Sequence, residues 1–396
     1  MCRAAAATRP RVTLADLVRV CGEAVARTHR LAKVQQVALR AIAACRTAVL
    51  GGHRDTCDWC GATRITYNSC RNRHCPTCQT TARDRWLEAR RAELLPIPYF
   101  HVVFTLPHAL NALAQGNPRV VYGLLFRAAT DTLLAFGRDP RHLGGTIGVT
   151  AILHTWGQTL SQHLHLHCVV TGGALSPDST HWIPARRGFL FPVRALAVVF
   201  RARYLDELRR AYDAHRLTFA GGTAPLADQA TWSRFLHTLH AQAWVVYAKP
   251  PFGGPERVLA YLARYTHRVA ITDARLVDLV DGVVRFRWKD YADHDRVKVM
   301  ALAADEFLRR FLLHVLPSRF VRIRHAGLFA NHDRHARLDR CRALLGASPI
   351  PPPPADTAPL DAPDRCPVCG QGTMRRTALL APLRIGSCAL RAPDPP

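Results

Sequence analysis

Acidic residues and lysine are both scarce in this sequence of 396 residues. Asp and Glu total 29 against 54 Lys and Arg, which gives a formal net charge of +25. Only four of the cations are lysines, so arginine carries nearly all of the positive charge. A surplus of this size is unusual for an enzyme of small-molecule metabolism and indicates a polyanionic partner. Arginine suits nucleic acid because its guanidinium makes bidentate phosphate contacts and stacks on bases.

Long uncharged apolar runs are also missing. No run approaches the roughly 18 residues of a membrane-spanning helix. The first twenty residues lack the apolar stretch and small-residue cleavage site of a secretory leader. We therefore expect a cytoplasmic protein with no membrane partner. Apolar residues make up 48% of the chain, which is enough to bury a core and excludes a disordered or fibrous protein.

Hydrophobic periodicity predicts helices mixed with short strands. Helices are expected over 13–50, with Thr13 as an N-cap, and over 80–95, 119–136, 194–216, 228–241, 255–266 and 303–315. Strands are expected over 99–106, 146–154, 164–171, 244–248, 268–277 and 282–288, the last two joined by a turn at Asp281-Gly282. The proline-rich stretch 349–363 is typical of a linker.

Cysteine is abundant, and five of the thirteen residues form the pattern Cys57-x2-Cys60-x9-Cys70-x4-Cys75-x2-Cys78. Two C-x-x-C pairs in a cytoplasmic chain indicate a metal site rather than disulfides. The predicted ligands of one tetrahedral zinc ion are Cys57, Cys60, Cys75 and Cys78. Cys70 and His74 are additional candidates, either beside this site or at a second ion. A separate C-x-x-C at positions 366 and 369 leaves metal binding there open.

A strand with alternating histidines is the second concentration of chemistry. In His163-Leu-His165-Leu-His167 the three imidazoles project from one face of the strand, because strand residues alternate between faces. Such a row can hold a divalent metal ion whose remaining ligands are phosphate or water. His154, on the preceding predicted strand, and Gln158 are candidates to complete the site.

Two tyrosines on one helix face form the third feature. Tyr261 and Tyr265 are four residues apart in the predicted helix 255–266, and Arg264 lies within one turn of Tyr261. A tyrosine hydroxyl can attack a phosphodiester if a cation and a metal ion stabilise the developing charge. Taken alone, the pair is more often packing than catalysis, and the histidine strand gives it weight.

These motifs together resemble the two-tyrosine HUH transposases of the insertion-sequence-91 family, which move by rolling-circle transposition. Phe104-Thr-Leu-Pro107 resembles the family's first motif, and His165-Leu-His167 is similar to its HUH motif. Tyr261 and Tyr265, within YLARYTHRVAI, resemble the catalytic tyrosine pair, and the cluster CDWCGATRITYNSCRNRHCPTC resembles the N-terminal zinc-binding domain. The resemblance covers most of residues 10–330.

The resemblance implies an α+β fold, in which a central antiparallel sheet of the HUH endonuclease (Rep-like) type is flanked by helices and preceded by a helical zinc-binding module. The implied parts are residues 1–95, with the zinc module, 96–330, the catalytic domain, and 331–396, with a C-terminal helix, the linker and the C-x-x-C tail. Catalysis would use Mg²⁺ or Mn²⁺ on His165 and His167, with His163 as a further ligand, in addition to structural Zn²⁺. The tyrosines would cleave single-stranded or locally melted DNA at the element's ends and its target through 5′-phosphotyrosine links. The protein would work in the bacterial cytoplasm, associated with the nucleoid when bound.

Three other functions use part of the same evidence. A plasmid replication initiator or relaxase shares the nuclease chemistry, but the N-terminal cysteine cluster speaks against it. A non-catalytic zinc-dependent DNA-binding protein accounts for charge and cysteines, but has no use for the histidine row. A cut-and-paste transposase needs three carboxylates, and no such trio stands out in the sequence. The sequence gives neither the oligomeric state nor the order in which the tyrosines act.

Overall fold

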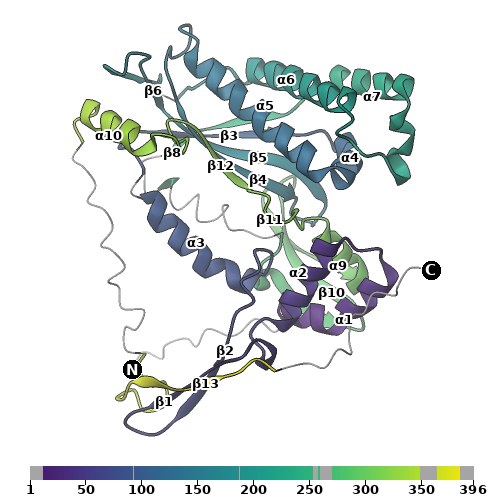
Figure 1. Ribbon diagram of the computed structural model, residues 1–396, viewed down its shortest axis with the longest axis vertical. Coiled ribbons are helices and arrows are strands. Elements are labelled where there is room, and N and C mark those ends of the chain that lie inside the picture. The colour runs from purple at the N-terminus through teal and green to yellow at the C-terminus, as the bar shows by residue number, and fades with distance from the viewer. Residues whose placement is uncertain are drawn as a thin grey trace.

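A five-stranded antiparallel sheet forms the centre of the computed structural model, which describes residues 12–91, 93–186, 188–252, 257–258, 270–347 and 364–383 (Figure 1). The strand order is β12-β4-β5-β3-β8. The strands are β3 (Tyr99–Thr105), β4 (Gly148–Trp156), β5 (Gln162–Thr171), β8 (Val246–Phe252) and β12 (Ile323–Gly327). The histidine strand, β5, lies at the middle of this order, and a short loop joins it to its neighbour β4.

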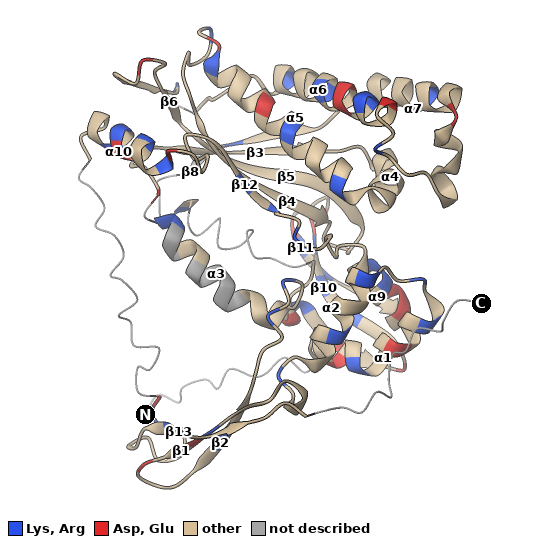
Figure 2. Ribbon diagram, viewed as in Figure 1, with Lys and Arg blue, Asp and Glu red and all other residues tan. Residues whose placement is uncertain are grey.

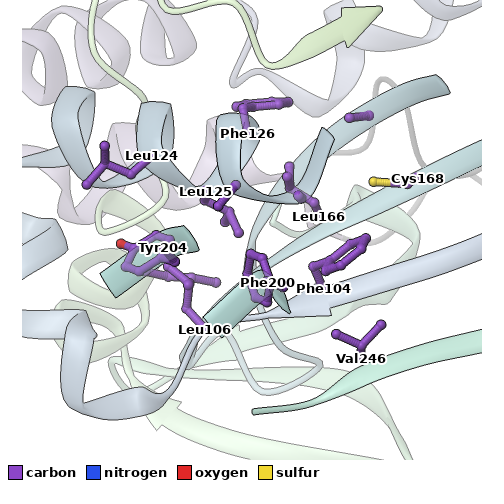
Figure 3. Close-up of a cluster of buried hydrophobic side chains, with 14 of the residues drawn as sticks. Phe104, Leu106, Leu124, Leu125, Phe126, Leu166, Cys168, Phe200, Tyr204 and Val246 are labelled. Atoms are coloured by element: carbon purple, nitrogen blue, oxygen red, sulfur yellow. The ribbon is translucent and has the colours of Figure 1, made fainter. Parts of the chain in front are cut away.

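One face of this sheet packs on two long helices, α5 (Pro118–Arg138) and α6 (Val193–Asp213). Figure 3 shows this core, where Phe104 of β3 contacts Phe200 of α6 edge-on at 4.9 Å between ring centroids. Leu164, Leu166 and Cys168 of β5 all point into it and are fully buried. Alternation along β5 therefore sends its histidines to the opposite face. Shorter helices extend this layer, namely α4 (Asn111–Gly116) and α7 (Gln229–Ala241).

The opposite face of the sheet carries apolar side chains on one half and histidine side chains on the other. Its apolar half contains Tyr99, Ile152 and Val169, which belong to one buried cluster with Val258 and residues of α10 (Arg334–Leu344). Trp86 of α3 (Pro76–Arg91) packs against the same cluster. The side of the face nearer the β4–β5 loop carries the histidines.

A second core joins the N-terminus to residues far along the chain. Helices α1 (Leu14–Thr28) and α2 (Lys33–Ala44) share buried side chains with a three-stranded sheet and α9 (Ala304–Leu312). The strands of that sheet are β9 (Leu276–Val280), β10 (Val283–Asp290) and β11 (Arg296–Ala303). A fragment that begins at residue 96 would expose the rings of Phe307 and Phe311, so we do not expect that fragment to fold normally.

Two smaller sheets complete the described chain. β6 (Gly173–Leu175) pairs with β7 (Trp182–Pro184). β1 (Gly52–Cys57) lies between β2 (Thr63–Tyr67) and β13 (Met374–Leu380), and these three form an arm that Figure 1 shows apart from the central sheet. The C-terminal segment is thus one edge strand of an N-terminal hairpin.

The fold class expected from the sequence is confirmed, because the structure is α+β with antiparallel sheets and an N-terminal helical region. Thr13 caps α1 in a capping box, in which its hydroxyl accepts from the Asp16 N–H at 3.2 Å. The predicted helix 13–50 is two helices, and the predicted strand 268–277 lies at 276–280 instead. Strands β1, β2, β6, β7, β11, β12 and β13 were not predicted, and most of the predicted helix 255–266 lies outside the described residues.

Helix α5 is long and apolar enough to cross a membrane by length and composition, the one such helix among the described residues. The sequence had suggested no such segment. Of its most apolar 18-residue window, 56% is buried inside the protein, where it covers the central sheet. Burial against the central sheet therefore accounts for the apolar character of α5.

Candidate functional site

Three histidines from two adjacent strands meet on the open half of the sheet. His165 and His167 come from β5, and His154 of β4 is the direct antiparallel partner of His165. One ring nitrogen from each lies within 4.8 Å of the others. The Nε2 atoms of His165 and His167 are 3.0 Å apart, which matches two ligands at right angles about 2.1 Å from one ion. We call these three residues the histidine trio.

Hydrogen bonds and ring stacking hold the rings of the trio in their orientations. His165 Nδ1 lies 2.9 Å from the carbonyl oxygen of His163, so the proton of a neutral ring is on Nδ1 and Nε2 keeps its lone pair. His167 Nδ1 lies 2.9 Å from His101 Nε2, and the two rings stack. The ring of His154 stacks on Trp156 at 4.6 Å. The Nε2 atom of His165 therefore presents a lone pair towards Nε2 of His167, which does the same in the tautomer whose Nδ1–H donates to His101.

The charge state of these rings also suits a ligand role. Burial lowers the pKa of His165 to about 4 and that of His101 to about 3. Burial also moves the pKa of His167 well below its ordinary value, and His154 and His165 add to the shift. The rings of His101, His165 and His167 are therefore neutral at pH 7, which is the form that binds metal.

The structure differs from the sequence prediction in which histidines it assembles. His154, expected as an additional candidate, is a full member of the trio, whereas His163 is not. The ring of His163 lies against His108, with 3.3 Å between Nδ1 and Nε2. Sequence reasoning missed His101 altogether. Its position in the predicted strand 99–106 was the available signal, because β3 pairs with β5 and places His101 on the histidine face.

Basic side chains lie at both edges of the sheet: Lys249 is beside the histidines, whereas Arg324 pairs with Ala151 and lies over the ring of Phe126 on the α5 side. Lys249 of β8 pairs with His101 across the strands, is exposed, and helps to lower the pKa of His101 and His167. At the other edge a groove of about 570 Å³ runs along β12. Its basic lining residues are Arg119, Arg319, Arg324 and His325. In Figure 2, Lys and Arg positions are spread over α5, α6, α9 and α10.

The tyrosine pair and Arg264 lie outside the described residues, but both ends of their segment are placed. Val258, three residues before Tyr261, is fully buried in the cluster that contains Ile152. Ile152 is the cross-strand partner of His167. At the other end, Ala270 lines a small cavity together with Trp156, whose ring stacks on His154. Val258 and Ala270, the described residues on either side of the segment 259–269, therefore both lie near the histidine face.

The cysteines form two clusters rather than the single set expected. Cys75 and Cys78, at the start of α3, lie with Cys70 and with Cys45 at the end of α2. We call this group the inner cluster, and neighbouring sulfur atoms in it are 3.5 or 3.6 Å apart. Cys57 and Cys60 lie in the other group, with the C-terminal pair Cys366 and Cys369. The grouping of Cys57 and Cys60 with Cys75 and Cys78 is wrong, because the β1–β2 hairpin carries the first pair away from α3.

His74, another metal candidate, has a different role. Its Nε2 accepts a hydrogen bond from the Leu316 N–H at 3.1 Å, and its Nδ1 lies 3.2 Å from Asn72 Oδ1. Both ring nitrogens are therefore occupied, and the ring joins the cysteine module to the segment after α9. Nearby, His314 is buried between the carbonyl of Leu160 and the Thr155 hydroxyl, at 3.0 and 3.2 Å.

The burial of His314 predicts a loss of stability in mild acid. Burial lowers the pKa of His314 to about 4, so the unfolded chain takes up a proton below about pH 6.5 while the folded chain does not. Stability from this residue is present above pH 6.5 and lost as the pH falls towards 4. Between pH 7 and pH 5 the loss is about 2 kcal/mol.

Denaturant unfolding of the wild type and of His314→Gln at both pH values measures this contribution. The variant should lose less stability on acidification, because glutamine can donate to Leu160 without titrating. His332→Gln, at an exposed position, is the control and should follow the wild type. The comparison cancels other acid-sensitive groups, including the cysteines. Equal slopes for all three proteins would contradict the assignment.

An antiparallel sheet with a histidine trio on one face, beside a cysteine-rich module and with a basic surface, is an arrangement suited to a protein that processes nucleic acid. Comparison with known proteins agrees. Residues 148–337 match a sequence family described as "Putative transposase", and residues 17–106 match the "Transposase zinc-binding domain". The chain is 53% identical over 373 residues to the "Putative transposase y4qJ" of Sinorhizobium fredii, covering 91% of this chain and 94% of that protein.

A second relative is more distant but is named for its element. The "Transposase for insertion sequence element IS801" of Pseudomonas savastanoi pv. phaseolicola is 28% identical over 365 residues, which cover 88% of this chain and 85% of that protein. The chain belongs to the insertion-sequence-91 family of transposases, as its motifs suggested. It is a DNA-processing enzyme and carries a zinc-binding domain.

Proposed function

We propose that this transposase cleaves and rejoins single-stranded DNA through covalent tyrosine–phosphate links, the chemistry of rolling-circle transposition. The observation that carries the proposal is the histidine trio, whose ring nitrogens converge near Val258 and Ala270, the described residues that flank the segment bearing Tyr261 and Tyr265. A purely DNA-binding protein has no need of buried imidazoles whose ring nitrogens converge.

The donor set fits a divalent metal ion with open positions. His154, His165 and His167 would hold the ion, which would act as a Lewis acid on the scissile phosphate. An all-nitrogen set suits Mn²⁺ better than Mg²⁺, because Mg²⁺ prefers oxygen ligands. His101 keeps the ring of His167 in orientation through the hydrogen bond between their nitrogens.

The residues of the chain have distinct roles in the proposed reaction. One tyrosine oxygen attacks phosphorus and loses its proton, the bond from phosphorus to the 3′ oxygen breaks, and that oxygen takes up a proton to leave a free 3′-OH. The new link is a 5′-phosphotyrosine, which stores the energy of the broken bond, so rejoining needs no ATP. Arg264 and the ammonium of Lys249 supply positive charge near the developing negative charge. The second tyrosine acts on the other strand.

The basic groove along β12 supports a single-stranded substrate. It runs along the edge strand β12, where Ile323, the partner of Ile152, faces the histidine side and Arg324, the partner of Ala151, faces α5, so a strand in the groove would pass around this edge to reach the trio. Arg119 and Arg324 line this groove and the adjoining hollow, and can neutralise successive phosphates. A base pair would keep the scissile phosphate away from the sheet, so a melted strand suits this path better than a duplex.

The inner cluster is the proposed zinc site of the zinc-binding domain. Four sulfurs at tetrahedral corners, each about 2.3 Å from zinc, are about 3.8 Å apart, close to the separations of 3.5 and 3.6 Å seen here. Cys45 and Cys75 are buried. This zinc would fasten the start of α3 to the end of α2 and so hold the module against the second core.

The direct test is covalent capture of labelled single-stranded DNA that contains an end of the element. The wild type should give a labelled protein band that survives denaturation in the presence of Mn²⁺ or Mg²⁺, more with Mn²⁺. EDTA should abolish the band while DNA binding, read by gel shift, persists. Duplex DNA of the same sequence is the control. Cleavage without a protein-linked product would refute the tyrosine mechanism.

A further inference from the structure

The second cysteine group joins parts of the chain that are 306 and 312 residues apart in sequence. We call it the outer cluster, formed by Cys57, Cys60, Cys366 and Cys369. The sulfur atoms of Cys57 and Cys369 are 3.8 Å apart, and those of Cys60 and Cys366 are 3.7 Å apart. We propose that the outer cluster is a second structural zinc site, which fastens the C-terminal segment to the N-terminal zinc-binding domain.

The sulfur separations identify a metal site rather than disulfides. A disulfide needs about 2.05 Å between sulfurs. Tetrahedral zinc with bonds of about 2.3 Å needs about 3.8 Å along each edge of the tetrahedron. The outer cluster matches the second requirement across the two chain segments. Each segment supplies one C-x-x-C pair, the ligand spacing typical of structural zinc.

Backbone groups around these sulfurs are arranged to stabilise thiolates. The N–H groups of Trp59 and Cys60 point at Cys57 Sγ at 3.4 and 3.5 Å. The N–H of Gly372 points at Cys369 Sγ at 3.3 Å. Such donors offset the negative charge that four zinc-bound thiolates accumulate. The two segments thus repeat the same arrangement, a tight turn whose amides face its sulfur.

Gly372 shows how closely the two segments approach. A Cβ atom at this position would lie 2.4 Å from the Sγ atom of Cys57 and 2.6 Å from the Cβ atom of Trp59. A side chain here would displace the sulfur from the cluster. The C-terminal turn is therefore shaped to receive the ligand from β1.

The arm cannot hold itself together by apolar burial. Its buried cluster consists of Cys57, Cys366 and Met374, two of which are the proposed ligands. Two ion pairs across the segments, Asp58 with Arg375 and Arg64 with Asp364, are at the surface, with the Arg375 side chain 72% and the Asp364 side chain 57% exposed, and contribute little. Six backbone pairs connect β1 to β13, but an edge strand with so small a core is marginal. Metal binding supplies the missing free energy, as in other small zinc modules.

The arrangement has a consequence for the whole chain. β13 covers the edge of β1 that β2 leaves open, and the yellow C-terminal strand beside the purple N-terminal strands in Figure 1 shows this pairing. Loss of the metal would release the segment 364–383 and expose that edge. The site does not depend on the histidine trio or on the proposed DNA chemistry.

Zinc stoichiometry of the purified full chain in reducing buffer tests the proposal. The double variant Cys366→Ser/Cys369→Ser should contain one zinc ion fewer per chain than the wild type. Cys21→Ser, which alters a cysteine outside both clusters, is the matched control and should keep the wild-type content. Equal zinc in the wild type and the double variant would overturn the proposal.

Hydrogen exchange tests the fastening itself. Amides of β13 that pair with β1 should be protected in the wild type and exchange at least tenfold faster in the double variant, while β4 and β5 stay protected. Gly372→Ala keeps all four cysteines, so it should lose the same zinc ion to a chelator at least tenfold faster than the wild type does. Unchanged protection of β13 after loss of the ion would show that zinc does not fasten the segment, and would overturn that part.

Discussion

The double variant Tyr261→Phe/Tyr265→Phe is expected to form no covalent adduct with single-stranded DNA, against ready capture by the wild type. Phenylalanine keeps each ring and removes only the hydroxyl. A tyrosine that merely packs would lose about one hydrogen bond, of order 1 kcal/mol, and activity would survive. A nucleophile loses its reaction entirely. Covalent capture with a labelled strand and Mn²⁺ measures the difference.

The matched control is Tyr291→Phe, an exposed tyrosine whose hydroxyl accepts from Gln158 at 2.9 Å. It should capture DNA as the wild type does. Each single variant should be blocked in transposition, even where one still nicks. Arg264 follows Tyr261 by three residues, within one turn of the predicted helix, so we expect Tyr261 to attack first, and peptide mapping of the adduct reads the order. An adduct formed by the double variant would end the mechanism.

The second large effect is expected at the histidine trio. Alanine at His154, His165 or His167 removes one of three ligands, and DNA cleavage should fall by at least a thousandfold while binding persists. A loss of this size corresponds to about 4 kcal/mol of transition-state stabilisation. Cleavage kinetics and gel shifts on the same preparations separate the two. Titration of Mn²⁺ into the protein without DNA should show lost affinity in all three variants.

Substitution of two neighbouring histidines should reduce DNA cleavage less than substitution within the trio. His163→Ala should be mild, because His163 contacts His108 and stands outside the trio. His101→Ala should fall between, because His101 holds His167 without belonging to the trio itself. Thermal unfolding controls for the cavities that these substitutions leave. Equal loss of DNA binding in all five variants would mean that the histidines are structural and that the metal assignment is wrong.

Local sequence patterns predicted much of the central sheet. Alternation of Leu and His along β5 sufficed to place the leucines in the core and the histidines on the other face. The dipeptide Asp281-Gly282 predicted a hairpin turn because a tight hairpin requires positive φ at both positions. The two residues have φ angles of 49° and 74° in the structure. Strands β1 and β2 were not predicted because their sequences, GHRDTC and TRITY, are mostly polar, and because β1 gains its second neighbour from the distant strand β13.

The domain organisation expected from the sequence, with divisions near residues 95 and 330, stays a prediction. The matched families cover residues 17–106 and 148–337. In the structure, α1 and α2 bury their apolar faces against β10 and α9, which lie more than two hundred residues later. Amphipathic periodicity indicates that a helix has a buried face, but it does not name the surface that buries it.

The sequence by itself determined which side chains our proposals use: arginines for DNA, cysteine pairs for zinc, a histidine row for a divalent metal ion and a tyrosine pair for attack. Only the tertiary structure decided the partners. Strand register brought His154 opposite His165, pairing of β3 with β5 brought His101 behind His167, and β13 brought Cys366 and Cys369 to Cys57 and Cys60. Residue type and short spacing fix what a side chain can do, because these act within one turn or strand. Which distant side chain completes a site depends on how the chain closes over hundreds of residues, and no local spacing encodes that.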